Sequence, residues 1–206
     1  MRHSLNLPNR ITLGRLVLAI VFVALLTQYA QRTPETWKLD VAWVLYVIAA
    51  ATDFLDGYIA RKYGMVTPLG RVLDPLVDKV LVCGAFVLFA GSGFVDGQGN
   101  NVTEVQAWMA VVIVVRELLV TGLRGFNESM GKSFGASIHG KLKMWMQSIA
   151  VPVILFIIAR ENGGALGAAG GWIKAVVAWM TVIITALSMI QYLVKSRYIL
   201  EESAPA

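Results

Sequence analysis

Long apolar stretches recur along this chain, and they limit its possible folds more than any other feature. The stretches are Leu16–Leu26, Val41–Ala51, Val72–Ala90, Ala107–Val115, Ile149–Ala159 and Val176–Ile190. Most extend through weakly polar residues to about 20 residues, the length that an α-helix needs to cross a bilayer. Six buried core helices of a soluble protein are the alternative, but only 15% of the residues are charged, too few to build a soluble surface. We therefore predict an all-α integral membrane protein with transmembrane helices at residues 10–29, 39–62, 70–91, 104–126, 140–160 and 172–195.

The six predicted helices leave no room for a second domain, so residues 1–206 are expected to form a single membrane domain. Residues 1–9 precede the first helix as a short juxtamembrane segment, in which Pro8 marks the entry to the helix. The segments 92–103 and 162–171 are rich in turn-forming residues. We predict that both are loops on the outer side of the membrane.

The basic residues predict how the chain is oriented. With the N-terminus inside, fourteen of the 18 Lys and Arg residues lie on the cytoplasmic side. The four on the other side are Arg32, Lys38, Arg160 and Lys174. The positive-inside rule therefore places both termini in the cytoplasm, and the net charge of +5 suits an anionic lipid surface. Nucleic acid is not expected as a partner, because no soluble basic face is available to bind it.

Four aspartates form the most informative motif of the chain. The motif reads Asp53-Phe-Leu-Asp56-Gly57-Tyr-Ile-Ala60-Arg61 and, eight residues later, Gly70-Arg-Val-Leu-Asp74-Pro-Leu-Val-Asp78. The first two aspartates share one face of a helix, and the last two share one face of the next helix. Because the connection 62–69 contains Gly64 and Pro68, we predict that the two helices pack as an antiparallel hairpin. Their carboxylates would then converge near the cytoplasmic boundary of the membrane.

Four carboxylates in an apolar setting cannot all stay ionised unless cations neutralise them. Carboxylate oxygens favour hard ions such as Mg²⁺, Mn²⁺ or Ca²⁺, and a pair of ions can clamp the attacking and leaving oxygens of a phosphoryl transfer. Gly57 and Ala60 remove side-chain bulk from the same face, which allows a nucleotide to lie against the helix; close helix packing is their alternative role. A structural aspartate or a proton relay explains one or two intramembrane carboxylates, but not four at these spacings.

The motif resembles the signature of the CDP-alcohol phosphotransferase family, Asp-x2-Asp-Gly-x2-Ala-Arg-x8-Gly-x3-Asp-x3-Asp, at every fixed position. The resemblance implies a fold of six transmembrane helices, usually homodimeric, that binds two divalent ions, Mg²⁺ or Mn²⁺. It implies metal binding by Asp53, Asp56, Asp74 and Asp78, with Asp78 also acting as the base that activates the acceptor hydroxyl. The implied CDP pocket contains Gly57, Ala60, Arg61 and Gly70.

A polar stripe marks the start of the first predicted helix. It consists of Asn6, Asn9, Thr12 and Arg15, which recur every three residues. Helix capping by Asn9, with an arginine that extends to the membrane surface, is the structural alternative. The segment Leu7-Pro8-Asn9-Arg-Ile-Thr12-Leu-Gly-Arg15 also resembles the opening of the phosphatidylglycerophosphate synthases of this family. That resemblance implies that Asn9 and Thr12 help to hold the nucleotide.

The fourth predicted helix carries Arg116 inside an apolar run, where an unpaired guanidinium is costly. Pairing with a carboxylate such as Glu117, or with an aspartate of the site, is one explanation. The other is that Arg116, Arg124 and Lys141 bind an acceptor phosphate, for which guanidinium forks are well suited. The segment Arg116-Glu117-x3-Thr121-Gly122-Leu123-Arg124, followed by Gly140-Lys141-x-Lys143 and Gln147, resembles the same synthases.

These resemblances imply an enzyme that transfers the phosphatidyl group of CDP-diacylglycerol to glycerol 3-phosphate, giving phosphatidylglycerol phosphate and CMP. Phosphatidylinositol-phosphate synthase and cardiolipin synthase share the aspartate signature and are the alternatives within the family. Membrane prenyltransferases also use aspartates and magnesium, but they need a longer chain and two separated motifs. A divalent-cation carrier is the alternative from another class. The expected location is the cytoplasmic membrane, among membrane lipids, with the active site open to the cytoplasm.

Overall fold

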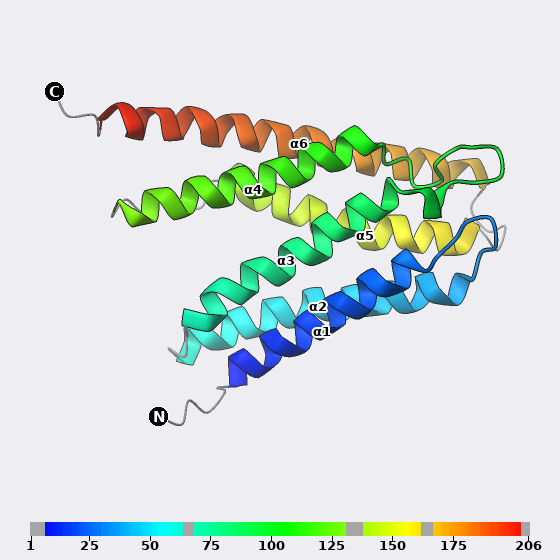
Figure 1. Ribbon diagram of the computed structural model, residues 1–206, viewed down its shortest axis with the longest axis horizontal. Coiled ribbons are helices and arrows are strands. Elements are labelled where there is room, and N and C mark those ends of the chain that lie inside the picture. The colour runs from blue at the N-terminus through cyan, green and yellow to red at the C-terminus, as the bar shows by residue number, and fades with distance from the viewer. Residues whose placement is uncertain (1–6, 64–67, 131–137, 162–166, 203–206) are drawn as a thin grey trace.

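The computed structural model is a bundle of six long α-helices (Figure 1). They are α1 (Leu7–Thr27), α2 (Thr36–Tyr63), α3 (Pro68–Phe89), α4 (Ala107–Ser129), α5 (Ile138–Glu161) and α6 (Gly167–Glu202). The structure describes the backbone of residues 7–63, 68–130, 138–161 and 167–202; within these ranges, the side chains of 7–9, 54–63, 68–72, 128, 138–139, 141, 167–168 and 195–202 are not described. The other regular elements in the described ranges are a short 3-10 helix, η1 (Ser92–Phe94), and a β-bridge between Val95 and Asn101.

All six predicted helices are present, with boundaries close to those expected. Helix α6 differs most, because it begins at Gly167 and continues to Glu202. A helix satisfies its own backbone hydrogen bonds, so it can continue through weakly polar residues on both sides of its apolar run. The predicted loop 162–171 is therefore wrong from Gly167 onward, where the chain is helical.

Three of the described helices are long and apolar enough to cross a membrane. The spans are Arg10–Thr27 in α1, Leu142–Glu161 in α5 and Ala169–Val194 in α6. Helices α2, α3 and α4 carry the carboxylates and many of the basic residues singled out in the sequence, and such charges reduce the preference of a helix for lipid. The chain is thus a membrane protein with several apolar helices, and six complete crossings stay a prediction.

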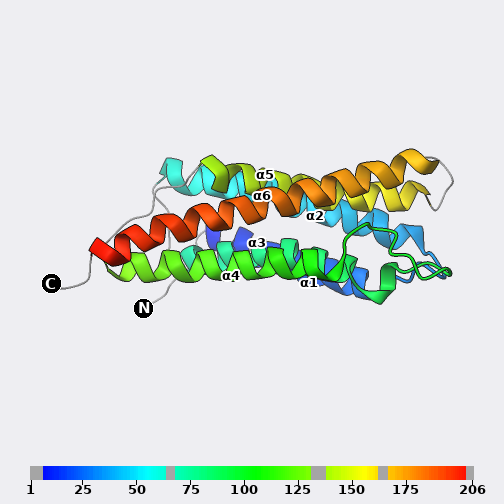
Figure 2. The ribbon, with the colours of Figure 1, turned by 90° about the horizontal axis from the view of Figure 1, so that it is seen from above.

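Successive helices run in opposite directions, so the bundle has two distinct ends (Figure 1, Figure 2). One end holds the start of α1 and the end of α6, and we call it the site end. The other holds the connection 90–106 between α3 and α4, and we call it the loop end. Helix α1 packs against α2 and α3, α5 packs against α2 and α6, and α3 reaches both α4 and α5.

The turn of the predicted α2–α3 hairpin, at residues 64–67, lies outside the described residues, as do the side chains of 54–63 and 68–72 on either side of it. In the described part of the chain these two helices have no extended contact with each other, and α1 packs against both of them. Helix α1 offers these two helices a fully buried apolar face that includes Ala19 and Phe22. The packing of α2 and α3 on α1 is therefore present, and their direct packing on each other stays a prediction.

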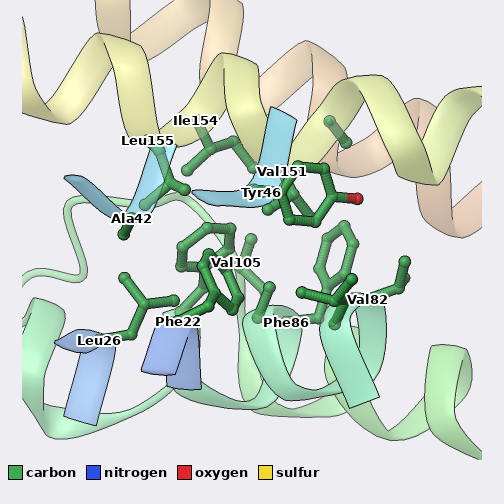
Figure 3. Close-up of a cluster of buried hydrophobic side chains, with 14 of the residues drawn as sticks. Phe22, Leu26, Ala42, Tyr46, Val82, Phe86, Val105, Val151, Ile154 and Leu155 are labelled. Carbon is green, nitrogen blue, oxygen red and sulfur yellow. The ribbon is translucent and has the colours of Figure 1, made fainter. Parts of the chain in front are cut away.

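An apolar core fills the bundle toward the loop end (Figure 3). The rings of Phe89 and Phe94 meet edge to face at 5.4 Å, and Tyr29 lies against Phe94 at 5.0 Å. The hydroxyl of Tyr46 marks where this core stops, because it hydrogen-bonds to the side chain of Ser148 and lies within electrostatic range of a carboxylate on α3. Beyond Tyr46, toward the site end, buried polar side chains such as Arg116, Lys143 and Gln147 accompany the apolar ones.

Candidate active site

Two polar side chains of α1 hold carboxylates of both neighbouring helices. Thr12 and Arg15 lie one turn apart and so share a face of α1. Thr12 Oγ1 donates to Asp74 Oδ1 on α3 at 2.8 Å, and Arg15 Nη1 lies 2.6 Å from Asp53 Oδ1 on α2. Helix α1 therefore brings together two of the predicted metal ligands, one from each helix.

The burial of these contacts shows that the two side chains of α1 point into the bundle. Thr12 and Arg15 are each only 2% exposed, whereas the side chain of Asp53 is 44% exposed. Arg15 thus turns inward to a carboxylate instead of extending to the membrane surface, which was the structural alternative for the polar stripe. A buried guanidinium needs such an anion, because leaving it unpaired in a low-dielectric interior is costly.

Asp78 lies one turn beyond Asp74 on α3, and its carboxylate has no partner among the described side chains. Among the described residues it makes no hydrogen bond and no ion pair. The charged groups within electrostatic range of it are Lys143, Asp53, Glu117 and Arg15. An ionised carboxylate whose oxygens are not already engaged can accept a proton or bind a cation.

A second group of charged side chains lies where α4, α5 and α6 meet. Glu117 Oε1 accepts a hydrogen bond from Arg116 Nη1 at 3.1 Å and lies 2.5 Å from Lys143 Nζ. Arg116 also donates through Nε and Nη2 to Ser188 Oγ, at 3.1 and 2.7 Å. All four residues are buried. The pairing of Arg116 with Glu117, one of the two explanations that the sequence left open, is present.

Arg124, two turns further along α4, joins the same group. Its Nη2 donates to the hydroxyl of Tyr192 at 3.1 Å. The ring of Tyr192 in turn faces the guanidinium of Arg116, with 5.7 Å between the ring centroid and Cζ. Tyr192 is buried, whereas Arg124 is exposed. One tyrosine of α6 thus contacts both arginines of α4.

The second group carries more positive than negative charge. Arg116, Lys143 and Arg124 are cations, and Glu117 is the described carboxylate in direct contact with two of them. The next carboxylate is Asp78, which interacts with Lys143 through space. Because a low-dielectric interior opposes uncompensated charge, this arrangement favours an anionic ligand.

The structure places some of the predicted site residues and not others. Asp53, Asp74 and Thr12 are connected through α1, and Arg116 and Arg124 lie in the second group. Residues whose side chains fall outside the described set are Asn9, Asp56, Gly57, Ala60, Arg61, Gly70 and Lys141. No three described His, Cys, Asp or Glu side chains gather as a metal site. Since Asp56 is not among them, the four-aspartate metal site stays a prediction.

Sequence reasoning did not single out the polar residues of α6. These are Thr181, Thr185, Ser188 and Tyr192, all of them buried. Their spacing of four, three and four places them on one face of the helix, and Gln147 Nε2 of α5 donates to Thr185 Oγ1 at 3.2 Å. A polar stripe with a helical period inside an apolar span is a signal that the sequence contains, but average hydropathy conceals it.

Comparison with known proteins matches one family over most of the chain. A family model described as CDP-alcohol phosphatidyltransferase matches residues 5–194. Three similar proteins are each described as CDP-diacylglycerol–glycerol-3-phosphate 3-phosphatidyltransferase. The protein of Bacillus subtilis is 37% identical and covers 73% of this chain and 76% of its own length. The protein of Rickettsia bellii is 34% identical and covers 89% of this chain and 93% of its own length. The protein of Pseudomonas fluorescens is 32% identical and covers 92% of this chain and 89% of its own length.

Proposed function

The chain belongs to the CDP-alcohol phosphatidyltransferase family, and we propose that it transfers the phosphatidyl group of CDP-diacylglycerol to glycerol 3-phosphate. The products are phosphatidylglycerol phosphate and CMP. The chain is a membrane-bound transferase of phospholipid biosynthesis, and the relatives described with this activity align with most of it. Two groups of side chains serve the reaction: the carboxylates around α1, and the cations where α4, α5 and α6 meet.

The observation that supports glycerol 3-phosphate is the excess of positive charge beside Asp78. A phosphate monoester brings a charge of about −1.5 to −2 at neutral pH, whereas serine or choline brings no phosphate to compensate the cations. Arg116 has five N–H donors, of which three are used by Ser188 and Glu117. The remaining two are available to phosphate oxygens. We assign the acceptor phosphate to Arg116, Arg124 and Lys141.

Asp78 is the proposed general base. Its carboxylate makes no hydrogen bond with a described residue, so it can take the proton from the primary hydroxyl of glycerol 3-phosphate. The hydroxyl oxygen forms a bond to the lipid-linked phosphorus, and the bond from that phosphorus to the oxygen of CMP breaks. Lys143 interacts with Asp78 through space and lies on the side of the second group of charged side chains.

The carboxylates around α1 are the proposed site for the CDP group and divalent ions. Metal binding is assigned to Asp53, Asp56, Asp74 and Asp78, and CDP binding to Asn9, Thr12, Gly57, Ala60, Arg61 and Gly70. The donor set consists of carboxylate oxygens and so fits hard ions. Bound Mg²⁺ or Mn²⁺ neutralises charge on the diphosphate and the carboxylates. Thr12 and Arg15 orient two of these carboxylates through the contacts that α1 makes with them.

The proposal also covers the position of the enzyme in its membrane. The site end faces the cytoplasm of the cell, with both termini on that side of the cytoplasmic membrane and membrane lipids around the apolar faces. Fourteen of the 18 basic residues on one side support this orientation. A homodimer is expected from the family resemblance. The mass of the purified protein in detergent, with the bound detergent subtracted, tests it.

The function is tested with purified protein in detergent, CDP-diacylglycerol, and Mg²⁺ or Mn²⁺. Separate reactions contain glycerol 3-phosphate, inositol phosphate, serine or phosphatidylglycerol, and CMP release is followed. Release with glycerol 3-phosphate alone supports the proposal. Release only with inositol phosphate or only with phosphatidylglycerol would reassign the chain to phosphatidylinositol-phosphate or cardiolipin synthesis. No release with any acceptor, together with cation flux into liposomes, would favour a cation carrier.

A further inference from the structure

We propose that Ser188 and Tyr192 of α6 are positioning residues that aim Arg116 and Arg124 at the acceptor phosphate, and that they thereby set the preference for a phosphorylated acceptor. The inference rests on the proposed phosphate-binding role of the two arginines. Neither α6 residue belongs to the aspartate motif or to the residues that the sequence assigned to the acceptor. Both act through the arginines.

Ser188 fixes the direction of the Arg116 guanidinium. Its Oγ accepts hydrogen bonds from both Nε and Nη2, at 3.1 and 2.7 Å, along one edge of the group. Glu117 accepts a third hydrogen bond, from Nη1. One N–H remains on each terminal nitrogen, and because the guanidinium is planar and rigid, holding one edge also sets where these two donors point.

Tyr192 connects this guanidinium to the next one. It lies four residues after Ser188, so both occupy the same face of α6. Its ring faces Arg116 at 5.7 Å, a distance typical of a cation–π contact, and its hydroxyl accepts from Arg124 Nη2 at 3.1 Å. The two arginines are separated by eight residues, or about 12 Å along the axis of α4. A single buried tyrosine therefore holds their charged groups at one location.

Holding two guanidinium groups together is opposed by electrostatic repulsion, and this repulsion suggests that the pair binds an anion. Like charges repel, most strongly on the side of buried Arg116, where the dielectric constant is low, so an unrestrained pair would separate. Serine and tyrosine are uncharged and oppose the separation without removing the repulsion. A bound phosphate supplies the missing negative charge. Because folding has already ordered the two long side chains, binding does not bear that entropy cost, and the site is preorganised for its anion.

The test uses the full-length enzyme and compares three variants. Tyr192→Phe removes the hydroxyl but keeps the ring that faces Arg116. Ser188→Ala removes the acceptor of two Arg116 hydrogen bonds. The matched control is Thr181→Val, which removes a buried hydroxyl of the same helix that donates to its own backbone, to the carbonyl of Val177.

We expect the KM for glycerol 3-phosphate to rise about three- to tenfold in Tyr192→Phe and at least as much in Ser188→Ala, as for loss of a hydrogen bond of typical strength. The inhibition constant of inorganic phosphate should rise in parallel. The kcat and the KM for CDP-diacylglycerol should stay near the wild-type values, and Thr181→Val should match wild type throughout.

The outcomes separate this inference from the function on which it rests. If wild type releases CMP with glycerol 3-phosphate but folded Tyr192→Phe keeps the same acceptor KM, α6 does not position the arginines. A fall in kcat alone, with both KM values unchanged, would indicate a merely structural role and also overturn the inference. If wild type does not use glycerol 3-phosphate at all, the proposed function fails instead. Should Ser188→Ala fail to fold, Tyr192→Phe decides by itself.

Discussion

Charged side chains occur at both ends of the bundle, but they are paired differently. At the loop end each ion pair joins one cation to one carboxylate: Arg160 lies 3.1 Å from Asp40, and Lys174 contacts Glu161. At the site end, Arg116 and Lys143 share the single carboxylate of Glu117. The ion pairs of the loop end are therefore one to one, whereas the described cluster of Arg116, Lys143 and Glu117 has more positive than negative charge.

This difference indicates that the fold by itself does not fully compensate the cations around Glu117. Buried ion pairs contribute little more than apolar residues of the same volume would, and the loop end has a dense core around Phe89 and Phe94. Charge that the fold does not neutralise must be neutralised by something else. We infer that the substrates and their divalent ions complete the site end, whereas the loop end is complete by itself.

The largest effect is expected from Asp78→Asn. It removes the proposed base, so CMP release should fall by about 10²- to 10⁴-fold, while binding of CDP-diacylglycerol is retained. Asp40→Asn is the control, because it alters an exposed carboxylate of the loop end and should leave turnover unchanged. Both variants are measured by CMP release and by equilibrium binding of the CDP-lipid. Retained turnover in Asp78→Asn would remove this residue from the base role.

The next effect is expected from Glu117→Gln, which leaves Arg116 and Lys143 without the carboxylate that they share. Loss of one partner from a buried ionic cluster lowers the free energy of unfolding by about 3 kcal/mol. Thermal unfolding in detergent measures this loss. Added inorganic phosphate should raise the melting temperature of the variant, because an anion that binds only the folded state stabilises it. A variant as stable as wild type would show that the cluster is not short of negative charge.

Glu161→Gln makes the same change at the loop end, where we expect a smaller effect. Glu161 is 22% exposed and keeps a neutral oxygen for buried Lys174, so the free energy of unfolding should fall by about 1 kcal/mol. CMP release per folded molecule should equal that of wild type, and phosphate should not stabilise the variant more than wild type. Selective stabilisation by phosphate here would erase the distinction between the two ends.

The smallest effect is expected from Asp96→Ala, in the connection 90–106 at the loop end. The N–H groups of Asn100 and Gln98 donate to the Asp96 carboxylate at 2.9 and 2.8 Å and hold its pKa below the ordinary value of 3.8. A carboxyl group whose pKa is lowered by folding stabilises the folded state when the pH is above the ordinary pKa of the group. This contribution is lost as the pH falls through the pKa of the folded state. Asp96→Ala should therefore melt slightly below wild type at neutral pH, and the gap should narrow in acid. A gap that widens in acid would contradict this assignment.

Much of the fold follows from local patterns. Apolar runs of membrane-spanning length predict six helices, and helical spacing predicts that Asp53 shares a face with Asp56, and Asp74 with Asp78. The same motif identifies the family. These inferences succeed because hydropathy and helical periodicity depend on neighbouring residues and need no knowledge of which helices touch.

The tertiary structure decided which helices meet and which charges pair. The sequence did not predict that α1 packs against both α2 and α3 and holds Asp53 and Asp74 through Arg15 and Thr12. It left two explanations open for Arg116 and did not single out Ser188, 72 residues away. Six helices of this kind can pack in many ways, and each choice gives a buried charge a different partner. The sequence by itself therefore determined the helices and the chemistry of their side chains, and only packing determined the partners, because a buried charge is stabilised by what lies across the bundle from it.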